Sequence, residues 1–240
     1  ETLVRLPNIA INYSGRQSEY VASHSIAKPR SEFKLREDAT LYFCSQSLYK
    51  YLPEYDHLYP EIARQVPNAQ FAFITSLNKD VENKFAKRIA VAFRDVGLDA
   101  DDYCVILPRL NSGDYLTMNR LADVFLDNPP WSGANTTLTA IDCDLPVVTW
   151  PTEFMRGRHS YAILKMLGIT DTVTNSADEY VEMAVRLGID DLWRCAMVQK
   201  IQQAKHKLYD DTSCVKGLEK FYEKTVYSRL NYVDQLPRGN

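Results

Sequence analysis

The sequence has 240 residues, of which 45% are hydrophobic and 25% are charged, and its formal net charge is -3. This length and composition fit one large or two small globular domains with a sizeable core, and the charge leaves no basic excess for binding nucleic acid or an anionic membrane. No apolar run is long enough to span a bilayer and no signal peptide opens the sequence, so we expect a cytoplasmic protein.

Residues 1–36 are predicted to be a linker, or a segment that packs on a missing N-terminal domain. An apolar run from Leu3 to Tyr13 is broken by Pro7, and a polar stretch containing Gly15 and Ser23 follows. Because the chain begins with Glu1 rather than methionine and opens irregularly, we expect it to be part of a longer protein.

From Asp38 onward, short apolar runs alternate with segments of helical periodicity, which predicts repeated β-α units. Strands are expected at residues 39–44, 70–74, 103–107, 122–126 and 146–149. Helices are expected at residues 53–66, 80–96, 114–121, 135–145, 160–168, 176–188, 191–208 and 215–230. Pro60 should kink the first helix or mark its real start, and Gly97 should end the second. The pattern predicts an α/β fold with a doubly wound parallel sheet.

The cysteines of the chain favour reduced thiols over disulfides or metal ligands, because they are odd in number, scattered and without metal-like spacing: Cys44, Cys104, Cys143, Cys195 and Cys214.

Three loops are expected at the carboxyl edge of this sheet, where α/β proteins bind ligands. They are residues 45–50, 108–114 and 128–135, and we expect them to converge on one crevice. The third loop is the most informative, since it leads from a buried strand into a helix that starts at Asn135. The first amides of a helix have no internal partner and carry partial positive charge, so this position suits an anion.

The composition of the third loop fits such a site and also fits an ordinary helix start. Gly133 and Ala134 allow a ligand close to the main chain, while Asn135, Thr136 and Thr137 can cap the helix or donate to phosphate oxygens. The local pattern alone favours an ordinary capped helix, because Asn and Thr are common caps without any ligand. The dinucleotide fingerprint GxGxxG and the P-loop are both absent, so only a generic phosphate site is indicated.

Four segments then occur in an informative order and spacing: SLYK at residues 47–50, RLADVFLD at 120–127, SGANTT at 132–137 and LPVVT at 145–149. Together they resemble the O-linked N-acetylglucosamine transferase family, including its bacterial tetratricopeptide-linked members. The resemblance covers about residues 38–227 and the C-terminal half of the family's catalytic region. It implies one half of a glycosyltransferase B fold, with a Rossmann-like nucleotide-sugar-binding domain at residues 37–210 and a C-terminal helix and tail at 211–240.

The resemblance also implies roles for individual residues. Lys50 would meet the pyrophosphate and neutralise charge on the departing nucleotide, although a lone lysine is more often a solvated surface residue. The main chain near Arg109 and Leu110 would bind the uracil edge. Tyr115 takes the position of a family histidine near the base, and is otherwise an ordinary amphipathic helix residue.

At the phosphate loop, Asn135 and Thr136 match paired threonines of the family and would hold phosphate oxygens. Arg158 aligns with a family arginine whose role the sequence does not define, whereas Arg156 and His159 equally fit a solvated basic turn.

Two positions depart from the family pattern. Thr139 stands where an acidic residue usually accepts hydrogen bonds from the ribose hydroxyls, and losing that charge-assisted pair should cost about 1 kcal/mol or somewhat more. Ser47 stands where a glutamine is common.

The leading hypothesis is the donor-binding half of an inverting, metal-independent protein O-glycosyltransferase. It would use a UDP-sugar of the UDP-N-acetylglucosamine type, need no cofactor and meet its protein acceptor through regions outside this chain. The alternative is a degenerate, non-catalytic binding or protein-interaction module of the same fold, for which Thr139 and Ser47 are the support. A nicotinamide dehydrogenase is disfavoured, because no glycine fingerprint follows the first strand.

Overall fold

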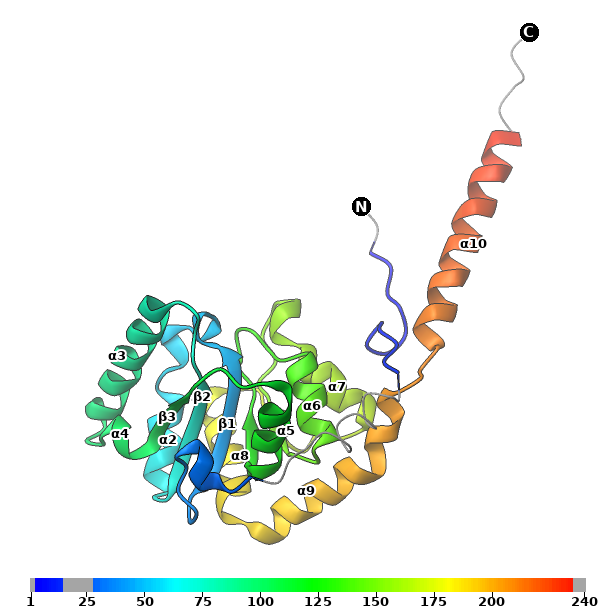
Figure 1. The fold of residues 1–240 in the computed structure, drawn as a ribbon. Coiled ribbons are helices and arrows are strands. Elements are labelled where there is room, and N and C mark those ends of the chain that lie inside the picture. The colour runs from blue at the N-terminus through cyan, green and yellow to red at the C-terminus, as the bar shows by residue number, and fades with distance from the viewer. Residues whose placement is uncertain (1–2, 15–27, 235–240) are drawn as a thin grey trace.

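The computed structural model describes residues 3–14 and 28–234, so the predicted polar stretch with Gly15 and Ser23 and the tail after residue 234 lie outside the described residues. The body is a five-stranded parallel sheet in the order β3-β2-β1-β4-β5, with helices on both faces (Figure 1). Its strands are β1 (Thr40–Ser47), β2 (Ala69–Ile74), β3 (Cys104–Leu107), β4 (Val124–Leu126) and β5 (Val147–Val148). The predicted doubly wound α/β fold is confirmed.

Alternation along the strands divides the apolar side chains between two cores, because successive residues of a strand point to opposite faces. In β1, Tyr42 and Cys44 belong to the first core, whereas Leu41 and Phe43 belong to the second. Strands β1, β2, β4 and β5 are mostly buried on both faces, as expected for parallel strands covered by helices on each side, whereas three of the four residues of the edge strand β3 are only half-buried.

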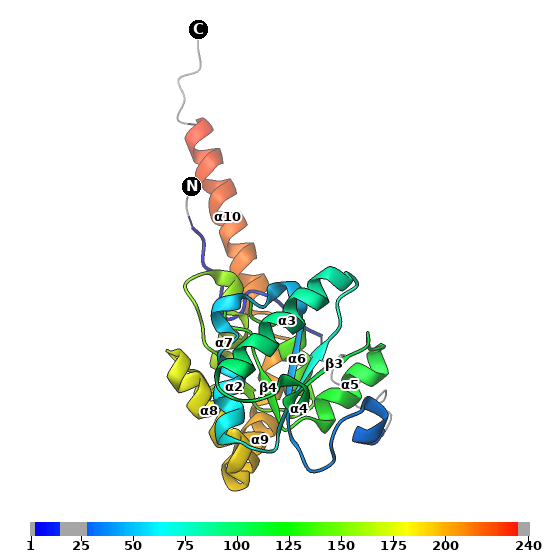
Figure 2. The same cartoon turned by 90° about the vertical axis from the view of Figure 1, so that its left-hand side faces the viewer.

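Different helices cover the two faces. The first core is closed by α2 (Leu58–Gln65), α3 (Lys79–Asp95) and α8 (Ala177–Ile189). The second is closed by α5 (Ser112–Leu121), α6 (Asn135–Asp142) and α7 (His159–Leu167). Figure 2 shows α2 and α8 on one side of the sheet and α5 on the other. Helix α9 (Asp191–Ala204) serves both cores, since Met197 lies in the first and Ile201 in the second.

Local signals explain most helix boundaries. The side chains of Asn78, Asn111 and Ser176 accept hydrogen bonds from the first turns of α3, α5 and α8. The helix expected at residues 53–66 divides into a 3-10 turn, η3 (Pro53–Tyr55), and α2, whose first turn contains Pro60, so this proline marks the real start. The short helix α4 (Ala100–Tyr103), capped by the side chain of Asp99, was not predicted.

Residues before the predicted domain start at residue 37 also pack on the sheet. A short 3-10 helix, η1 (Arg30–Phe33), precedes β1, and both Phe33 and Leu35 are buried in the second core. The Arg30 guanidinium donates to the main-chain oxygen of Ala39 at 2.6 Å and to the Asp123 carboxylate at 3.0 Å. Apolar burial and these hydrogen bonds join residues 30–36 to the sheet domain.

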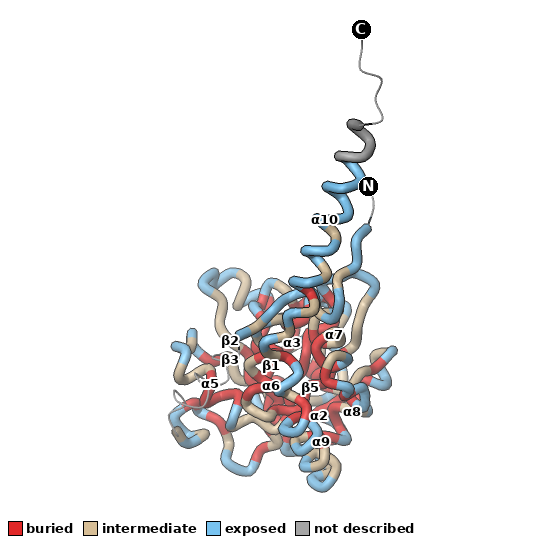
Figure 3. Tube along the Cα trace, turned by 90° about the vertical axis from the view of Figure 1, so that its right-hand side faces the viewer, coloured by how far each residue is buried: buried red, intermediate tan, exposed pale blue. Residues whose placement is uncertain are grey.

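The N-terminal segment, residues 3–14, lies beside residues 209–217. Helix α10 (Ser213–Asp234) extends away from the body (Figure 1), and its described side chains are mostly exposed (Figure 3). Tyr13 forms a parallel bridge with Tyr209, and the Asn8 amide donates to the Asp211 carboxylate at 2.6 Å. No helix in the described part of the chain is long and apolar enough to cross a membrane.

Candidate functional site

The carboxyl end of β1 carries an irregularity that shapes the site. Cys44 pairs with Phe73 and Ser47 pairs with Ile74, so Ser45 and Gln46 have no matching residues on β2. Such a bulge changes the direction in which side chains leave a strand. Here Gln46 is buried, with 4% of its surface exposed, whereas Ser47 is exposed.

Gln46 connects the two positions that the sequence singled out. Its Nε2 donates to Thr136 Oγ1 at 2.9 Å, and its Oε1 accepts from Lys50 Nζ at 3.1 Å. The Asn128 amide donates to the main-chain oxygen of Lys50 at 3.0 Å. Lys50 and the N-terminus of α6 therefore lie side by side, as their predicted joint role requires; that role itself stays a prediction.

Sequence reasoning named Ser47 and missed Gln46. A glutamine is present in this chain, one residue before the position where the resemblance led us to expect it. Because the bulge begins after Cys44, the residue that faces Thr136 is not the one indicated by counting along the chain. The nearby glutamine was the available signal.

A buried carboxylate holds the loop between β4 and α6. Asp127, 1% exposed, accepts hydrogen bonds from the Gly133 amide and from the hydroxyls of Ser132 and Thr149, each at 2.7 Å. Burial raises the pKa of Asp127, and the hydrogen bonds to its carboxylate oppose that rise. Because these three buried donors all have Asp127 as their acceptor, the loop is fixed at the point where the helix begins.

The main chain of Gly133 serves the turn. Its amide donates to Asp127, and its carbonyl accepts from the Thr137 hydroxyl at 3.1 Å, so the amides open to a ligand begin after this residue. A Cβ here would lie 2.3 Å from Thr136 Oγ1 and 2.6 Å from Thr137 Oγ1. Glycine is required because side chains of the turn occupy this space, a reason the sequence did not reveal.

Helix α6 starts without a side-chain cap. Ala134 is the N-cap residue, Asn135 is exposed and Thr136 is half-buried. The hydroxyl of Thr139 donates to the main-chain oxygen of Asn135 at 3.0 Å, which leaves its oxygen lone pairs as acceptors. Of the two roles that the sequence allowed for Asn135, Thr136 and Thr137, capping is not observed, since none of the three caps the helix. The uncapped end suits an anion.

Tyr115 connects α5 to the bulge. Its hydroxyl donates to Ser45 Oγ at 3.1 Å, its ring lies 5.7 Å from that of Phe43, and burial raises its pKa to about 12. The predicted base-binding residues Arg109 and Leu110 line a cavity of about 460 Å³ together with Thr75, Glu82 and Asp114. None of the residues around this cavity is shared with the contacts between Lys50, Gln46 and Thr136.

The basic turn after β5 lies against the loop before α6. The Ser132 amide donates to the main-chain oxygen of Arg156 at 2.8 Å, and the guanidinium of Arg158 donates to the main-chain oxygen of Thr152 at 2.8 Å. His159 is the first residue of α7. Arg156 thus lies at the site, whereas the hydrogen bond of Arg158 serves its own turn.

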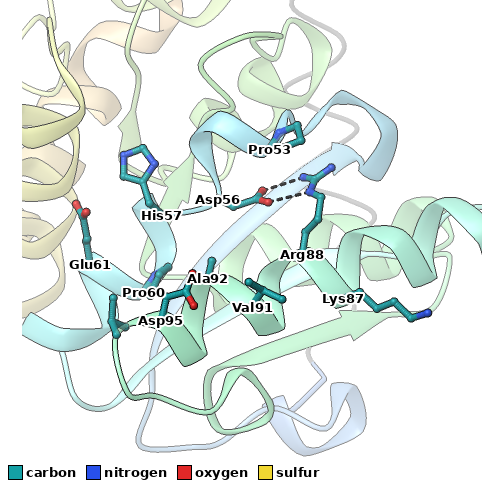
Figure 4. A pocket seen from close by; sticks show the side chains of 11 residues that line it. Pro53, Asp56, His57, Pro60, Glu61, Lys87, Arg88, Val91, Ala92 and Asp95 are labelled. Carbon is teal, nitrogen blue, oxygen red and sulfur yellow. Dashed lines mark hydrogen bonds and ion pairs between the residues drawn. The ribbon is translucent and has the colours of Figure 1, made fainter.

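A second hollow, of about 520 Å³, lies between α2 and α3 (Figure 4). In its wall, two nitrogens of the Arg88 guanidinium donate to the two carboxylate oxygens of Asp56, each at 2.8 Å. A further hydrogen bond from Arg88 to the main-chain oxygen of Tyr51, at 2.9 Å, supports the segment that follows Lys50.

Among the described residues, no group of three His, Cys, Asp or Glu side chains gathers as a metal ion would require.

Comparison with known proteins gives a consistent result. The profile of glycosyl transferase family 41 matches residues 7–216. The probable UDP-N-acetylglucosamine–peptide N-acetylglucosaminyltransferase SEC of Arabidopsis thaliana is 27% identical over 228 residues, which are 93% of this chain and 23% of that protein. The UDP-N-acetylglucosamine–peptide N-acetylglucosaminyltransferase of Caenorhabditis elegans is 25% identical over 195 residues, 81% of this chain and 16% of that protein. The chain therefore spans less than a quarter of these relatives' lengths.

Two solved structures share the fold. A mutant of the Thermobaculum terrenum O-GlcNAc transferase superposes with a TM-score of 0.73 and 23% identity, over 93% of this chain and 41% of that one. The apo structure of OtsA superposes with a TM-score of 0.59 and 16% identity, over 89% of this chain and 50% of that one. The sheet and its helices correspond to one Rossmann-like half of the glycosyltransferase B fold.

Proposed function

Because the chain belongs to glycosyl transferase family 41, we propose that it is the nucleotide-sugar-binding half of an inverting protein O-glycosyltransferase. Membership confirms the resemblance drawn from the sequence. The donor in this proposal is a UDP-sugar of the UDP-N-acetylglucosamine type, in keeping with the names of the relatives. The acceptor is a serine or threonine hydroxyl of a protein, bound through regions outside this chain.

One observation carries the proposal: Gln46 holds the Lys50 ammonium and the Thr136 hydroxyl together at the uncapped start of α6. The ammonium, the helix amides and the threonine hydroxyl are all groups that bind phosphate oxygens. These groups meet at the carboxyl edge of a parallel sheet, and folds of this kind bind their ligands at that edge.

In the proposed reaction, this half acts on the leaving group. As the bond between the sugar and the diphosphate breaks, negative charge grows on the departing phosphate oxygen. The Lys50 ammonium and the positive end of α6 stabilise that charge without reorganising, because the Asp127 hydrogen bonds have already fixed the loop. The attacking hydroxyl and its base come from outside this chain.

Calorimetry with UDP tests the proposal on the 240-residue chain. We expect weak but measurable binding at millimolar ligand, reduced about tenfold by Lys50→Ala, because an ammonium contact to phosphate contributes roughly 1.5 kcal/mol. Lys84→Ala is the matched control, since Lys84 is an exposed lysine of α3. A folded chain that gives no heat with UDP would contradict the proposal.

A second candidate function is a non-catalytic module of the same fold, and the observation that supports it is Thr139. Its hydroxyl already donates to the Asn135 carbonyl, so it offers ribose hydroxyls a neutral acceptor in place of a carboxylate. Replacing Thr139 by Glu should strengthen UDP binding by about fivefold if an ancestral site has decayed, because charge-assisted hydrogen bonds are about twice as strong as neutral ones. Unchanged or weaker binding would favour a working site that uses the threonine.

A further inference from the structure

Exposed apolar and aromatic side chains gather on the open side of the site. Trp131 comes from the loop before α6 and is 42% exposed. Phe154, 55% exposed, and Met155, 77% exposed, come from the turn η4 (Met155–Gly157) and the residue before it. We name the set Trp131, Phe154, Met155 and Arg156 the aromatic rim.

The aromatic rim is held in place by its own contacts. The Arg156 guanidinium lies 4.5 Å from the ring centre of Phe154 and 5.8 Å from that of Trp131, both within the range of cation–π attraction. The Ser132 amide donates to the main-chain oxygen of Arg156 at 2.8 Å. At Gly157, a Cβ would lie 2.7 Å from the Pro129 carbonyl oxygen, so the two loops touch without space for a side chain.

The rim adjoins the residue assigned to the diphosphate. Lys50 Nζ lies 5.3 Å from the ring centre of Trp131. In a UDP-sugar, a single oxygen joins the sugar to the β-phosphate, so a diphosphate held by Lys50 brings the sugar ring next to Trp131. Sugar rings carry faces of C–H groups with partial positive charge, which pack well on the electron-rich face of an indole.

We propose that Trp131 is the platform on which the sugar ring of the donor packs, with Arg156 fixing the indole and offering guanidinium N–H groups to sugar hydroxyls. This inference rests on the proposed function, because it assumes that Lys50 meets the diphosphate. It makes Trp131 a specificity-determining residue that distinguishes a nucleotide sugar from the nucleotide alone.

Saturation-transfer NMR with UDP and with UDP-N-acetylglucosamine tests the inference on the 240-residue chain. In the wild type, sugar-ring protons should receive saturation comparable to that of the uridine protons. Trp131→Ala should halve the sugar signal relative to the uridine signal and weaken UDP-N-acetylglucosamine binding by about fivefold, with less than about a twofold change for UDP. Trp131→Leu, which keeps bulk without the ring, should behave like Trp131→Ala.

Trp193→Ala is the matched control, because Trp193 also lies under an arginine, Arg186 at 4.3 Å, but on α9. Trp193→Ala should leave the binding of both UDP and UDP-N-acetylglucosamine unchanged. Equal losses of UDP and UDP-sugar in both Trp131 variants would overturn the inference, as would an unchanged sugar signal. A wild-type chain that binds neither ligand would overturn the proposed function, and the inference with it.

Discussion

On the inner side of the loop between β4 and α6, the hydroxyls of Ser132 and Thr149 and the amide of Gly133 all donate to Asp127, and each of these residues is almost completely buried. On the outer side, Asn135 and Trp131 are exposed, and Lys50 is only partly buried. The same turn is thus closed toward the core and open toward solvent. On the inner side, groups whose hydrogen bonds are made within the protein contribute to stability. On the outer side, groups that can still contact a ligand contribute to binding.

If this division is correct, the largest effect on stability should come from Asp127→Ala. The change leaves one buried amide and two buried hydroxyls without their acceptor, so we expect the free energy of unfolding in urea to fall by about 3 kcal/mol. Asp95→Ala, at an exposed carboxylate of α3, should stay within about 0.5 kcal/mol of the wild type. A loss at Asp127 no larger than this would show that the inner side does not support the loop.

Gly133→Ala should affect both sides of the loop at once. The new Cβ would meet the hydroxyls of Thr136 and Thr137, and overpacking of this kind costs about 2 kcal/mol of stability. UDP binding should weaken as well, because the start of α6 must shift.

The matched change Gly168→Ala separates backbone strain from the site. Gly168 has a φ of +79° and open space around it, so alanine there should cost about 1 kcal/mol of stability without affecting UDP binding. Denaturation and calorimetry on both variants make the comparison, and normal UDP binding by Gly133→Ala would count against the assigned position of the ligand.

Gln46→Ala should act mainly on the outer side. Lys50 and Thr136 lose their common partner, so we expect UDP affinity to fall by about fivefold, roughly 1 kcal/mol. A double-mutant cycle with Lys50→Ala should give a coupling energy of about 0.5 kcal/mol or more. Gln65→Ala on α2 is the control, and strictly additive losses would mean that Gln46 does not position the ammonium.

The smallest effect concerns pH. Burial raises the pKa of Asp127 in the folded chain above its usual value, so its contribution to stability is fully present below the unfolded pKa and is lost as pH rises through the folded pKa. The stability of the wild type relative to Asp127→Asn should therefore decrease from acidic pH toward neutrality and then level off. Urea unfolding across that range measures the difference, and an increase with pH would reverse the assigned sign.

Much of the fold follows from local pattern. The strand runs are rich in buried apolar residues, and caps such as Asn111 and Ser176 are short-range signals. The helix α4 was missed because a single turn is too short to show periodicity. The burial of Phe33 and Leu35 was missed because a pair of apolar residues in a polar segment does not reveal which surface they meet.

The site was less accessible to sequence reasoning. The positions of Lys50 and Asn135 followed from the order of strand, loop and helix, but the role of Gln46 depends on a bulge that no local pattern marks. The contact between Trp131 and Arg156 joins two loops separated by a helix and a strand. Such contacts arise only from tertiary packing. The sequence could therefore indicate the residues of the site but not which of them contact each other.

The order of the strands has a consequence for how the protein acquires its site. Gln46 and Thr136 are 90 residues apart in the chain and meet because β1 and β4 are neighbours in the sheet. Contacts of such long range form late, since the loop between them must first be closed at an entropic cost. We expect the proposed phosphate-binding site to be among the last features to form during refolding. A partly folded chain would then contain its helices before it could bind a nucleotide.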